Sequence, residues 1–131
     1  GKAPVGSSVV WYGVHAVEML QRAMGSGAVA VTARRDATGV TAVVDYADRR
    51  RGVVELTEGA GIYGGTLRNS QSASAFSVNV GAFYSKLLGD IERFFRGGEP
   101  PASLDDALEV LAILDAAERS QQSNRTEPVL R

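Results

Sequence analysis

The chain has 131 residues, which fits a single domain covering residues 1–131, since domains usually run to about 100–200 residues. Hydrophobic residues make up 44% and charged residues 22%, a composition that excludes a disordered chain. The net charge of −1 and the pI near 5.8 provide no basic surface for nucleic acid or an anionic membrane, and the lack of cysteine excludes disulfides and thiolate metal sites.

No apolar run approaches the ~18 residues that a membrane span needs, and the sequence carries no signal-peptide pattern. We therefore expect a soluble, cytoplasmic protein that binds neither membranes nor nucleic acid. The chain opens GKAPVG without an initiator methionine, which is expected of a processed product or of a piece excised from a longer chain.

Helical periodicity comes first, over residues 7–24 (SSVVWYGVHAVEMLQRAM). Its apolar residues recur every three to four positions, which predicts a helix with one buried face. Ser7 or Ser8 can cap the first turn. The helix is expected to end at Gly25-Ser26-Gly27, because glycine readily adopts the left-handed conformation that follows a helix.

The period then changes to two, which predicts short strands. Breaks rich in Gly, Asp or Arg separate the five segments, and tight connections of this kind predict an antiparallel meander. The segments cover residues 28–35, 39–47, 52–58, 63–70 and 72–80.

Two further helices follow the strands. In AFYSKLLGDIERFFRGG, from residue 82, large apolar residues recur at helical spacing, and Gly97-Gly98 with Pro100-Pro101 ends the pattern. The next helix begins at Ser103 as N-cap, with acidic residues in the first turn, where the helix dipole favours them. Its buried face is expected to carry Leu104, Leu108, Leu111 and Leu114.

Strands in one block with helices on either side of it indicate an α+β fold: an open, mainly antiparallel sheet of about five strands with helices packed on one face. The other face would carry small and mixed residues, such as Ala73, Ala75 and Ser77 opposite Phe76, Val78 and Val80. A face of this kind suits packing on a second copy, and we expect a homo-oligomer through the sheet face. A solvated face is the alternative.

The segment GAGIYG at residues 59–64 satisfies G-x-G-x-x-G, the dinucleotide fingerprint. That motif works only where its glycines turn from a strand into a helix, whose N-terminus holds the pyrophosphate, and where an acidic residue follows about 20 positions later. Here an alternating, Ser- and Thr-rich segment follows, and Asn79 stands at the acidic position. We interpret the glycines as a turn between two strands, with no cofactor-binding residue in this chain.

The only histidine is His15, in the first helix. A lone helix histidine is compatible with either a structural or a catalytic role. It cannot build a metal site, since no second histidine and no cysteine accompany it.

Two blocks stand at opposite ends of the chain: WYGVHAVEML at 11–20 and YSKLLGDIERFFRGGEPPASLDDALEVLAILDAAERSQQS at 84–123. Together they resemble the C-terminal domain of the Gfo/Idh/MocA oxidoreductases, the family of glucose–fructose oxidoreductase and inositol dehydrogenase. That domain opens with D-x-G-x-H followed by an apolar and an acidic residue. It ends with Y-x-x-L-x-x-I-x-x-F, a Pro-containing loop with a Ser N-cap, and a helix ending D-A-A-x-x-S. The matching residues are Gly13, His15, Glu18, Tyr84, Leu87, Ile91, Phe94, Pro101, Ser103, Ala107, Asp115, Ala116, Ala117 and Ser120.

The resemblance spans nearly the whole chain and implies a GAPDH-like C-terminal domain, with the N-terminal Rossmann domain absent from this chain. It implies a parent oxidoreductase that binds NAD or NADP in its Rossmann domain and passes hydride between the nicotinamide and a hydroxyl-bearing carbon of a sugar, cyclitol or related polyol. The implied partners are that small-molecule substrate, the chain's own Rossmann domain and further copies. The family's acid/base set is a lysine in an E-K-P motif of the Rossmann domain, with the Asp and His of D-x-x-x-H.

In this chain the histidine of that motif is His15, but Trp11 occupies the aspartate position. Tryptophan cannot exchange a proton; it can stack on a sugar face and donate one N–H. On the resemblance, His15 is the candidate catalytic residue, and Trp11, Tyr12 and Glu18 are candidate substrate-binding residues. Core packing is the alternative for Trp11 and Tyr12, and Glu18 would either orient His15 or face solvent.

We therefore expect the substrate-binding and oligomerisation domain of an NAD(P)-dependent oxidoreductase, inactive alone because the dinucleotide site and the lysine are missing from it. The first alternative is a non-catalytic binding or dimerisation module of the same fold. The second is a small stand-alone α+β enzyme with a cavity around His15, Trp11 and Tyr63.

Overall fold

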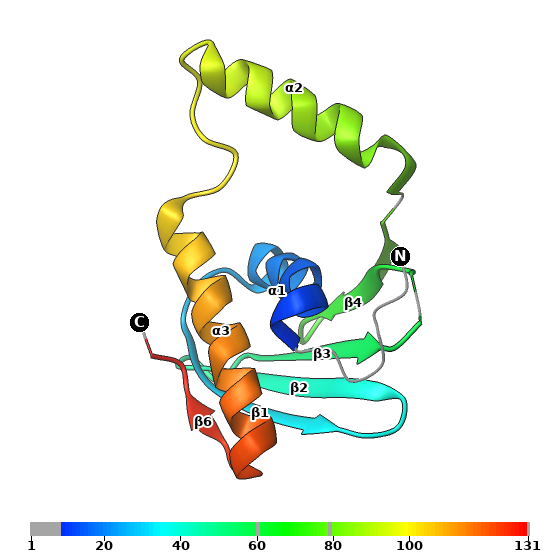
Figure 1. Cartoon of the computed structure of the whole chain (residues 1–131), viewed down its shortest axis with the longest axis vertical. Helices are drawn as coiled ribbons and strands as arrows, with labels where there is room; N and C mark the ends of the chain where they lie inside the picture. Colours follow the sequence, from blue (N-terminus) through cyan, green and yellow to red (C-terminus); the bar gives the residue numbers. More distant parts are fainter. Residues whose placement is uncertain (1–8, 60, 79, 131) are drawn as a thin grey trace. The chain divides into compact units, whose positions relative to one another are not determined.

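The computed structural model describes residues 9–59, 61–78 and 80–130. The chain divides into two compact units, of which the first comprises Gly1–Gly61 with Leu104–Arg131 and the second comprises Ile62–Ser103. The ribbon in Figure 1 traces both units in sequence colours, and each is considered by itself below.

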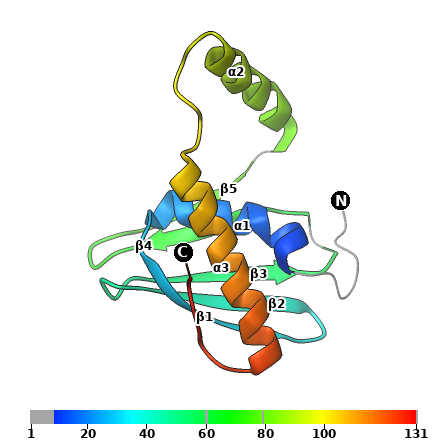
Figure 2. The same ribbon diagram turned by 60° about the vertical axis from the view of Figure 1, so that its left-hand side comes forward.

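The first unit contains a four-stranded antiparallel sheet with the strand order β3-β2-β1-β6. Strands β1 (Ala28–Arg35), β2 (Gly39–Tyr46) and β3 (Arg51–Thr57) form a meander, and the short β6 (Glu127–Pro128) adds to the free edge of β1. Helices α1 (Val9–Met24) and α3 (Leu104–Ser123) lie on the same side of this sheet (Figure 2). Helix α1 packs on α3 and β3, and α3 packs on β1.

The core of the first unit lies between the two helices and the inner face of the sheet. Every second side chain of β2 and β3 points inward, as the two-residue period predicts, and β1 follows the same alternation after the irregularity between Ala28 and Ala30. The largest fully buried side chains belong to the strands and to α3: Ile113, Leu114, Val31, Val44 and Ser120.

An aspartate in each of the two hairpin turns of the sheet accepts hydrogen bonds from residues of the same turn. In the β1–β2 turn the Asp36 carboxylate accepts hydrogen bonds from the Thr38 hydroxyl and backbone N–H, at 2.6 and 2.7 Å. These bonds hold the pKa of Asp36 below its ordinary value. In the β2–β3 turn the hydrogen bonds of Arg50 to Asp48 lower the pKa of that carboxyl in the same way.

The glycine end of α1 is confirmed. Gly25 has a φ of 71° and its N–H donates to the Gln21 carbonyl at 2.7 Å, which is the left-handed cap that glycine favours. The predicted caps, Ser7 and Ser8, lie outside the described residues.

The buried face of α3 differs from the prediction. Leu104, Leu108 and Leu111 are 74%, 52% and 54% exposed, and of the four predicted leucines only Leu114 is buried. The buried face carries smaller and polar side chains as well: Glu109, Val110, Ala112, Ile113, Leu114, Ala116, Ala117 and Ser120. Small residues allow α3 to approach β1 closely, so a pattern of leucines alone pointed to the wrong side of the helix.

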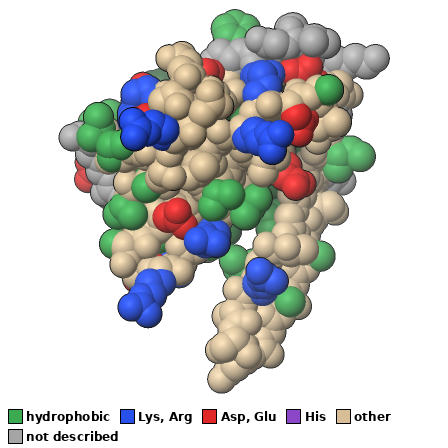
Figure 3. All heavy atoms as spheres, turned by 90° about the horizontal axis from the view of Figure 1, so that it is seen from below, with side chains coloured by type: hydrophobic (Ala, Val, Ile, Leu, Met, Phe, Trp, Pro, Cys, Tyr) green, Lys and Arg blue, Asp and Glu red, His purple; other side chains and the backbone are tan. Residues whose placement is uncertain are grey.

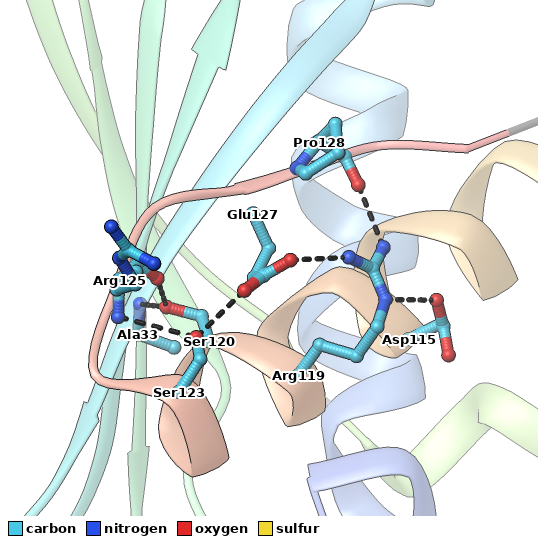
Figure 4. A network of polar contacts seen from close by, with 8 residues as sticks. All are labelled: Ala33, Asp115, Arg119, Ser120, Ser123, Arg125, Glu127 and Pro128. Atoms are coloured by element: carbon cyan, nitrogen blue, oxygen red, sulfur yellow. Dashed lines mark hydrogen bonds and ion pairs between the residues drawn. The ribbon is translucent and has the colours of Figure 1, made fainter.

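A polar network ties the C-terminal segment to α3 and β1 (Figure 4). The buried Ser120 hydroxyl accepts the Ala33 N–H at 2.8 Å and donates to the Arg125 carbonyl at 2.6 Å. Arg119 donates to the carboxylates of Asp115 and Glu127, and also to the carbonyl of residue 128. The D-A-A-x-x-S pattern therefore has a structural role here: it fastens β6 over the edge of the sheet.

The second unit contains the hairpin β4 (Gly64–Arg68) and β5 (Ala73–Ser77), a short 3-10 helix Val80–Ala82 labelled η1, and helix α2 (Phe83–Phe95). Helix α2 ends as predicted: Gly97 has a φ of 90°, and the N–H groups of Gly97 and Gly98 donate to the carbonyls of Phe94 and Arg93. None of the residues of β4, β5 or α2 is fully buried.

The α+β class and the mainly antiparallel strands with helices packed on one face are confirmed. The five predicted strands are all present, but they belong to two sheets rather than one continuous meander. The segment around Ala73, Ala75 and Ser77 thus lies in the two-stranded sheet and not on the face of the larger one. Among the described residues, no helix combines the length and apolar character needed to cross a membrane.

Candidate functional site

One face of α1 is exposed and carries most of the predicted site residues. Trp11, His15 and Glu18 follow each other at i, i+4 and i+7, so their side chains form one stripe along the helix. The stripe lies opposite the buried side of α1, which is formed by Val9, Gly13, Val17 and Gln21.

The aromatic residues of α1 differ in their surroundings. Trp11 is 71% exposed, so its side chain does not contribute to the core of the described residues. Tyr12, one residue on, is half-buried at the side of the stripe. Because the indole of Trp11 is exposed, its flat face is accessible to a ligand that binds beside α1.

His15 and Glu18 lie together within the stripe. The imidazole Nδ1 is 3.7 Å from Glu18 Oε2, and the two side chains are 51% and 59% exposed. This separation is within ion-pair range but longer than a hydrogen bond, and both side chains have room to rotate. The predicted proximity of His15 and Glu18 is therefore present in the structure.

Gly13 explains why α1 lies so close to the core. A Cβ at this position would stand 2.9 Å from Val9 Cγ1 and 3.1 Å from both Leu114 Cδ2 and Leu56 Cδ1. The helix backbone therefore packs directly on α3 and β3. His15 follows two residues later, about 200° further around the helix, and so faces outward.

Polar contacts at the other end of α1 fix its position against α3. Gln21 donates to the Asp106 carboxylate at 2.8 Å. The Glu109 carboxylate, 2% exposed, accepts the N–H groups of Gly27 and Ala28, both at 2.8 Å, immediately after the helix. The stripe is thus carried by a helix anchored at its C-terminal end.

Tyr46 lies near this anchor and is also buried. Burial, followed by the negative charge of Glu109, raises the pKa of the phenol, so it stays protonated. Its hydroxyl makes no hydrogen bond with the described residues, while the Arg50 guanidinium lies 4.9 Å from the centre of its ring. The Tyr46 hydroxyl is enclosed in the core and does not belong to the exposed stripe.

The glycine segment connects two strands, as predicted. Strand β3 ends at Thr57, Gly59 has a φ of 80°, and β4 begins at Gly64, with no helix following. Because β3 and β4 belong to different sheets, the connection is not a hairpin. The described residues therefore do not provide the strand–turn–helix unit that a dinucleotide needs.

The second alternative places Tyr63 beside His15 and Trp11. Tyr63 belongs to the second unit, and the alternative stays a prediction. The described part of the chain contains no group of three or more His, Asp or Glu side chains arranged to hold a metal ion.

The sequence matches no protein-family model and no curated protein. The structure, in contrast, resembles several solved oxidoreductases at 14–17% identity. GenD2 from gentamicin A biosynthesis, solved in complex with NAD, superposes with a TM-score of 0.79 at 17% identity, over 96% of this chain and 49% of its own.

Two further solved structures show the same relation. A protein from Sinorhizobium meliloti 1021, provisionally assigned as a myo-inositol dehydrogenase, has a TM-score of 0.66 at 16% identity, over 90% of this chain and 48% of its own. A provisionally assigned NADPH-dependent oxidoreductase from Desulfitobacterium hafniense has a TM-score of 0.72 at 14% identity, over 95% of this chain and 49% of its own. The chain spans about half the length of each.

The chain has the fold of a Gfo/Idh/MocA-type C-terminal domain. The resemblance found in its two terminal sequence blocks is thereby confirmed at the level of the fold. At this identity a shared fold does not transfer a substrate or a mechanism, which depend on the residues of the site.

The polar anchor at the C-terminal end of α1 was not predicted from the sequence. Glu109 lies between Leu108 and Val110 in an otherwise apolar stretch of α3. An acidic residue amid apolar neighbours signals a carboxylate with buried partners, since carboxylates are rarely buried unless paired. The sequence therefore indicates that Glu109 is buried. It does not indicate its partners, which are two backbone N–H groups 81 and 82 positions earlier in the chain.

Proposed function

We propose that the chain is the substrate-binding and oligomerisation domain of an NAD(P)-dependent oxidoreductase that acts on a sugar, cyclitol or related polyol. The observation that carries the proposal is the exposed stripe on α1, in which Trp11 and His15 stand one turn apart on a fold shared with NAD(P)-dependent oxidoreductases. The nicotinamide cofactor is proposed to bind in a Rossmann domain of the parent enzyme, where it exchanges hydride with the substrate.

His15 is proposed to take up and return the substrate's hydroxyl proton. Imidazole suits this role because it can accept and donate a proton near neutral pH. The ring is exposed on the outer side of α1, where a substrate can approach it. The parent's lysine is expected to share the work, since Trp11 holds the position of the family aspartate.

Trp11 and Tyr12 are proposed to contact the substrate's ring. The apolar faces of sugars and cyclitols stack on aromatic rings, and the tryptophan N–H can donate to a hydroxyl. Trp11 is the better placed of the two, because Tyr12 is half-buried. An aromatic residue in place of a carboxylate would select substrates by shape rather than by charge.

The activity is tested in the full-length parent, because the 131-residue chain is expected to be inactive alone. His15→Ala should lower kcat/KM by about 100-fold or more, the usual contribution of a general acid or base. The exposed Arg22→Ala, further along α1, is the matched control and should leave kcat/KM unchanged. An unaffected His15→Ala enzyme would favour the non-catalytic module, and polyol-dependent NAD reduction by the chain alone would favour the stand-alone enzyme.

The outer face of the large sheet is proposed to pair with a second copy. Arg34, Thr41 and Glu55 form one exposed row across β1, β2 and β3. In the next row on the same face, Thr32 and Val53 are exposed and Val43 between them is half-buried. Basic, acidic and hydrophobic side chains are interspersed on the side of the first unit turned away from α1 (Figure 3).

This face is self-complementary under a two-fold axis parallel to β2. Such an axis exchanges the two edges of the sheet and keeps the position along the strands. It would therefore place β1 of one copy opposite β3 of the other, with residues of the same row facing each other. Arg34 would then meet Glu55 of the second copy, and Val43 would meet its own equivalent. Two packed sheets deviate from parallel by about 30°, which long side chains can span.

Sedimentation of the chain tests the pairing. Val43→Lys would place like charges opposite each other at the centre and should give monomers, whereas Thr38→Lys in the β1–β2 turn should not change the assembly. Arg34→Glu should weaken the assembly, and adding Glu55→Arg should restore it. A wild-type monomer at all concentrations would contradict this part of the proposal.

A further inference from the structure

Three leucines of α3 belong neither to the core nor to the proposed site. Leu104, Leu108 and Leu111 follow each other at i, i+4 and i+7, so they form one stripe along the helix, which we call the leucine face. Each of these side chains is more than half exposed among the described residues, although their spacing predicts burial. A row of large apolar side chains on a surface is typical of a site that another protein element covers.

The leucine face and the stripe on α1 point the same way. Helices α1 and α3 lie on one side of the large sheet, as Figure 2 shows, and each turns its buried side toward the sheet and toward the other helix. Their exposed sides therefore both point away from the sheet. The stripe of Trp11, His15 and Glu18 and the leucine face are thus parts of the outer surface of one helix layer.

The contacts between the two helices place Leu111 beside the proposed catalytic histidine. Gln21 donates to Asp106, and the backbone at Gly13 packs on Leu114, so α1 and α3 run in opposite directions. Both helices advance by the same rise per residue. Three residues onward from the glycine on α1 therefore correspond to three residues back from Leu114 on α3. This places Leu111 at the level of residues 15 and 16.

Hydride transfer restricts which side of the domain the cofactor can approach. The reacting atoms must come within about 3–3.5 Å of each other, so a substrate bound on the α1 stripe has to lie between α1 and the nicotinamide. The solved relatives have about twice the length of this chain, which covers 49% of GenD2. A cofactor-binding half of that size has to contact the outer surface of the helix layer, whereas the outer face of the sheet lies on the opposite side.

The charges beside the leucine face indicate the chemistry of its partner. Asp105 is exposed, three residues before Leu108 and next to it on the helix surface. Helix α3 carries no Lys or Arg before Arg119, which donates to Asp115. The surface is therefore apolar with an acidic border, and its complement is an apolar patch bordered by Lys or Arg.

We propose that the leucine face is the surface on which the cofactor-binding half of the parent enzyme docks, and that this docking brings the nicotinamide over the α1 stripe. The identity of the partner rests on the proposed function. The leucines are then exposed in the 131-residue chain and buried in the parent, at the apolar centre of the interface between the two halves.

Thiol labelling tests the burial of the leucine face without measuring activity. The chain contains no cysteine, so Leu108→Cys introduces a single thiol into it. Its reaction with a maleimide should be slower in the full-length parent than in the 131-residue chain by about tenfold or more, because burial of a side chain of this size favours the closed state by at least that factor. Mass spectrometry of the α3 peptide measures both rates, and Leu111→Cys gives a second position. Equal rates would overturn the proposal.

Leu130→Cys is the matched control for the labelling. Leu130 is 64% exposed and lies outside α3, and its variant should react at the same rate in the chain and in the parent. Slow labelling of Leu108→Cys in the dilute 131-residue chain would assign the leucine face to another segment of this chain. Labelling that slows as the concentration of the chain rises would assign it to a second copy. Either result would overturn the proposal.

Kinetics of the parent separate the docking surface from the proposed function. The double variant Leu108→Gln with Leu111→Gln keeps helix propensity and should lower kcat/KM by about tenfold, while the unfolding midpoint of the 131-residue chain stays the same. Leu130→Gln should change neither quantity. An unchanged kcat/KM in the double variant would overturn the docking.

The two proposals fail in different ways. A parent with a protected thiol in Leu108→Cys and full activity in His15→Ala would refute the catalytic role and retain the docking surface. A parent that depends on His15 but labels Leu108→Cys as fast as the chain does would refute the docking surface alone.

Discussion

Helices α2 and α3 show how differently the two units of the chain use an apolar helix. Helix α2 has the clearer stripe of large apolar residues, yet Phe83, Leu87 and Ile91 are each more than one third exposed, and no residue of α2 is fully buried. Helix α3 has a less regular pattern, yet eight of its residues are buried. The first unit has a closed core, whereas the described residues of the second unit form none of their own.

The difference shows what periodicity indicates. A regular apolar stripe identifies a helix face whose burial stabilises the protein, but it does not identify the element that packs on that face. Helix α3 packs on β1 and α1. Its small residues allow close approach, and its buried polar groups have defined hydrogen-bond partners. Matched substitutions in the two helices should therefore give very different losses of stability.

The largest contrast is expected between two isoleucines. Ile113 of α3 is 1% exposed and Ile91 of α2 is 37% exposed. Ile113→Ala should lower the free energy of unfolding by about 3–4 kcal/mol, because it removes buried methylene groups and leaves a cavity. Ile91→Ala should lower it by less than about 1 kcal/mol. Urea unfolding followed by circular dichroism measures both, and equal losses would show that α2 is as buried as α3.

Two glutamates extend the contrast to polar groups. Glu109→Ala should lower the free energy of unfolding by about 2–3 kcal/mol, because it leaves the N–H groups of Gly27 and Ala28 without their acceptor. Glu92 of α2 forms an exposed pair with Arg96, and Glu92→Ala should change the free energy by less than about 0.5 kcal/mol. A small loss in Glu109→Ala would mean that water replaces the carboxylate.

Two serines give a smaller contrast. Ser120→Ala removes the acceptor of the Ala33 N–H and the donor to the Arg125 carbonyl, and about 1–2 kcal/mol should be lost. Faster hydrogen exchange of the amides around Glu127, which pairs with β1, should accompany the loss. The exposed Ser85→Ala in α2 should alter neither quantity. Unchanged exchange near Glu127 would show that the segment is held without Ser120.

The smallest contrast concerns two tyrosines. Tyr46→Phe removes a buried hydroxyl that has no hydrogen bond with the described residues, and it keeps the ring beneath Arg50. We expect the free energy of unfolding, measured by thermal unfolding, to stay the same or to rise by up to about 1 kcal/mol. Tyr84→Phe in α2, where the side chain is 76% exposed, should have no effect. A clear loss in Tyr46→Phe would reveal a partner for the hydroxyl.

Much of the fold could be predicted because local rules act strongly in this chain. Helix ends at Gly25 and Gly97 follow from the left-handed conformation, and the strand segments follow from alternation. The division of the strands between two sheets could not be predicted, since pairing between distant segments leaves no local pattern. The leucines of α3 predict the wrong face because small residues such as Ala116 and Ala117, which are 0% and 2% exposed, contribute to the buried face in their place.

The site was predictable to a similar extent. Spacing alone placed Trp11, His15 and Glu18 on one face of α1, since residues three and four apart lie together on a helix. That this face is the exposed one depends on where Gly13 packs, which spacing does not determine. The catalytic and substrate-binding roles of these residues remain proposals.

Gly13 has a consequence for how variants of this protein would be interpreted. A Cβ there would meet the side chains of Val9, Leu114 and Leu56 at 2.9–3.1 Å, so even Ala would require these side chains or α1 itself to shift by a few tenths of an ångström. Any shift of the α1 backbone would carry the imidazole of His15 with it, and for a residue with the proposed catalytic role a misplacement of about 1 Å can reduce a rate 100-fold. A substitution deep in the packing between α1 and α3 could therefore produce the phenotype of an active-site variant while the protein stays folded.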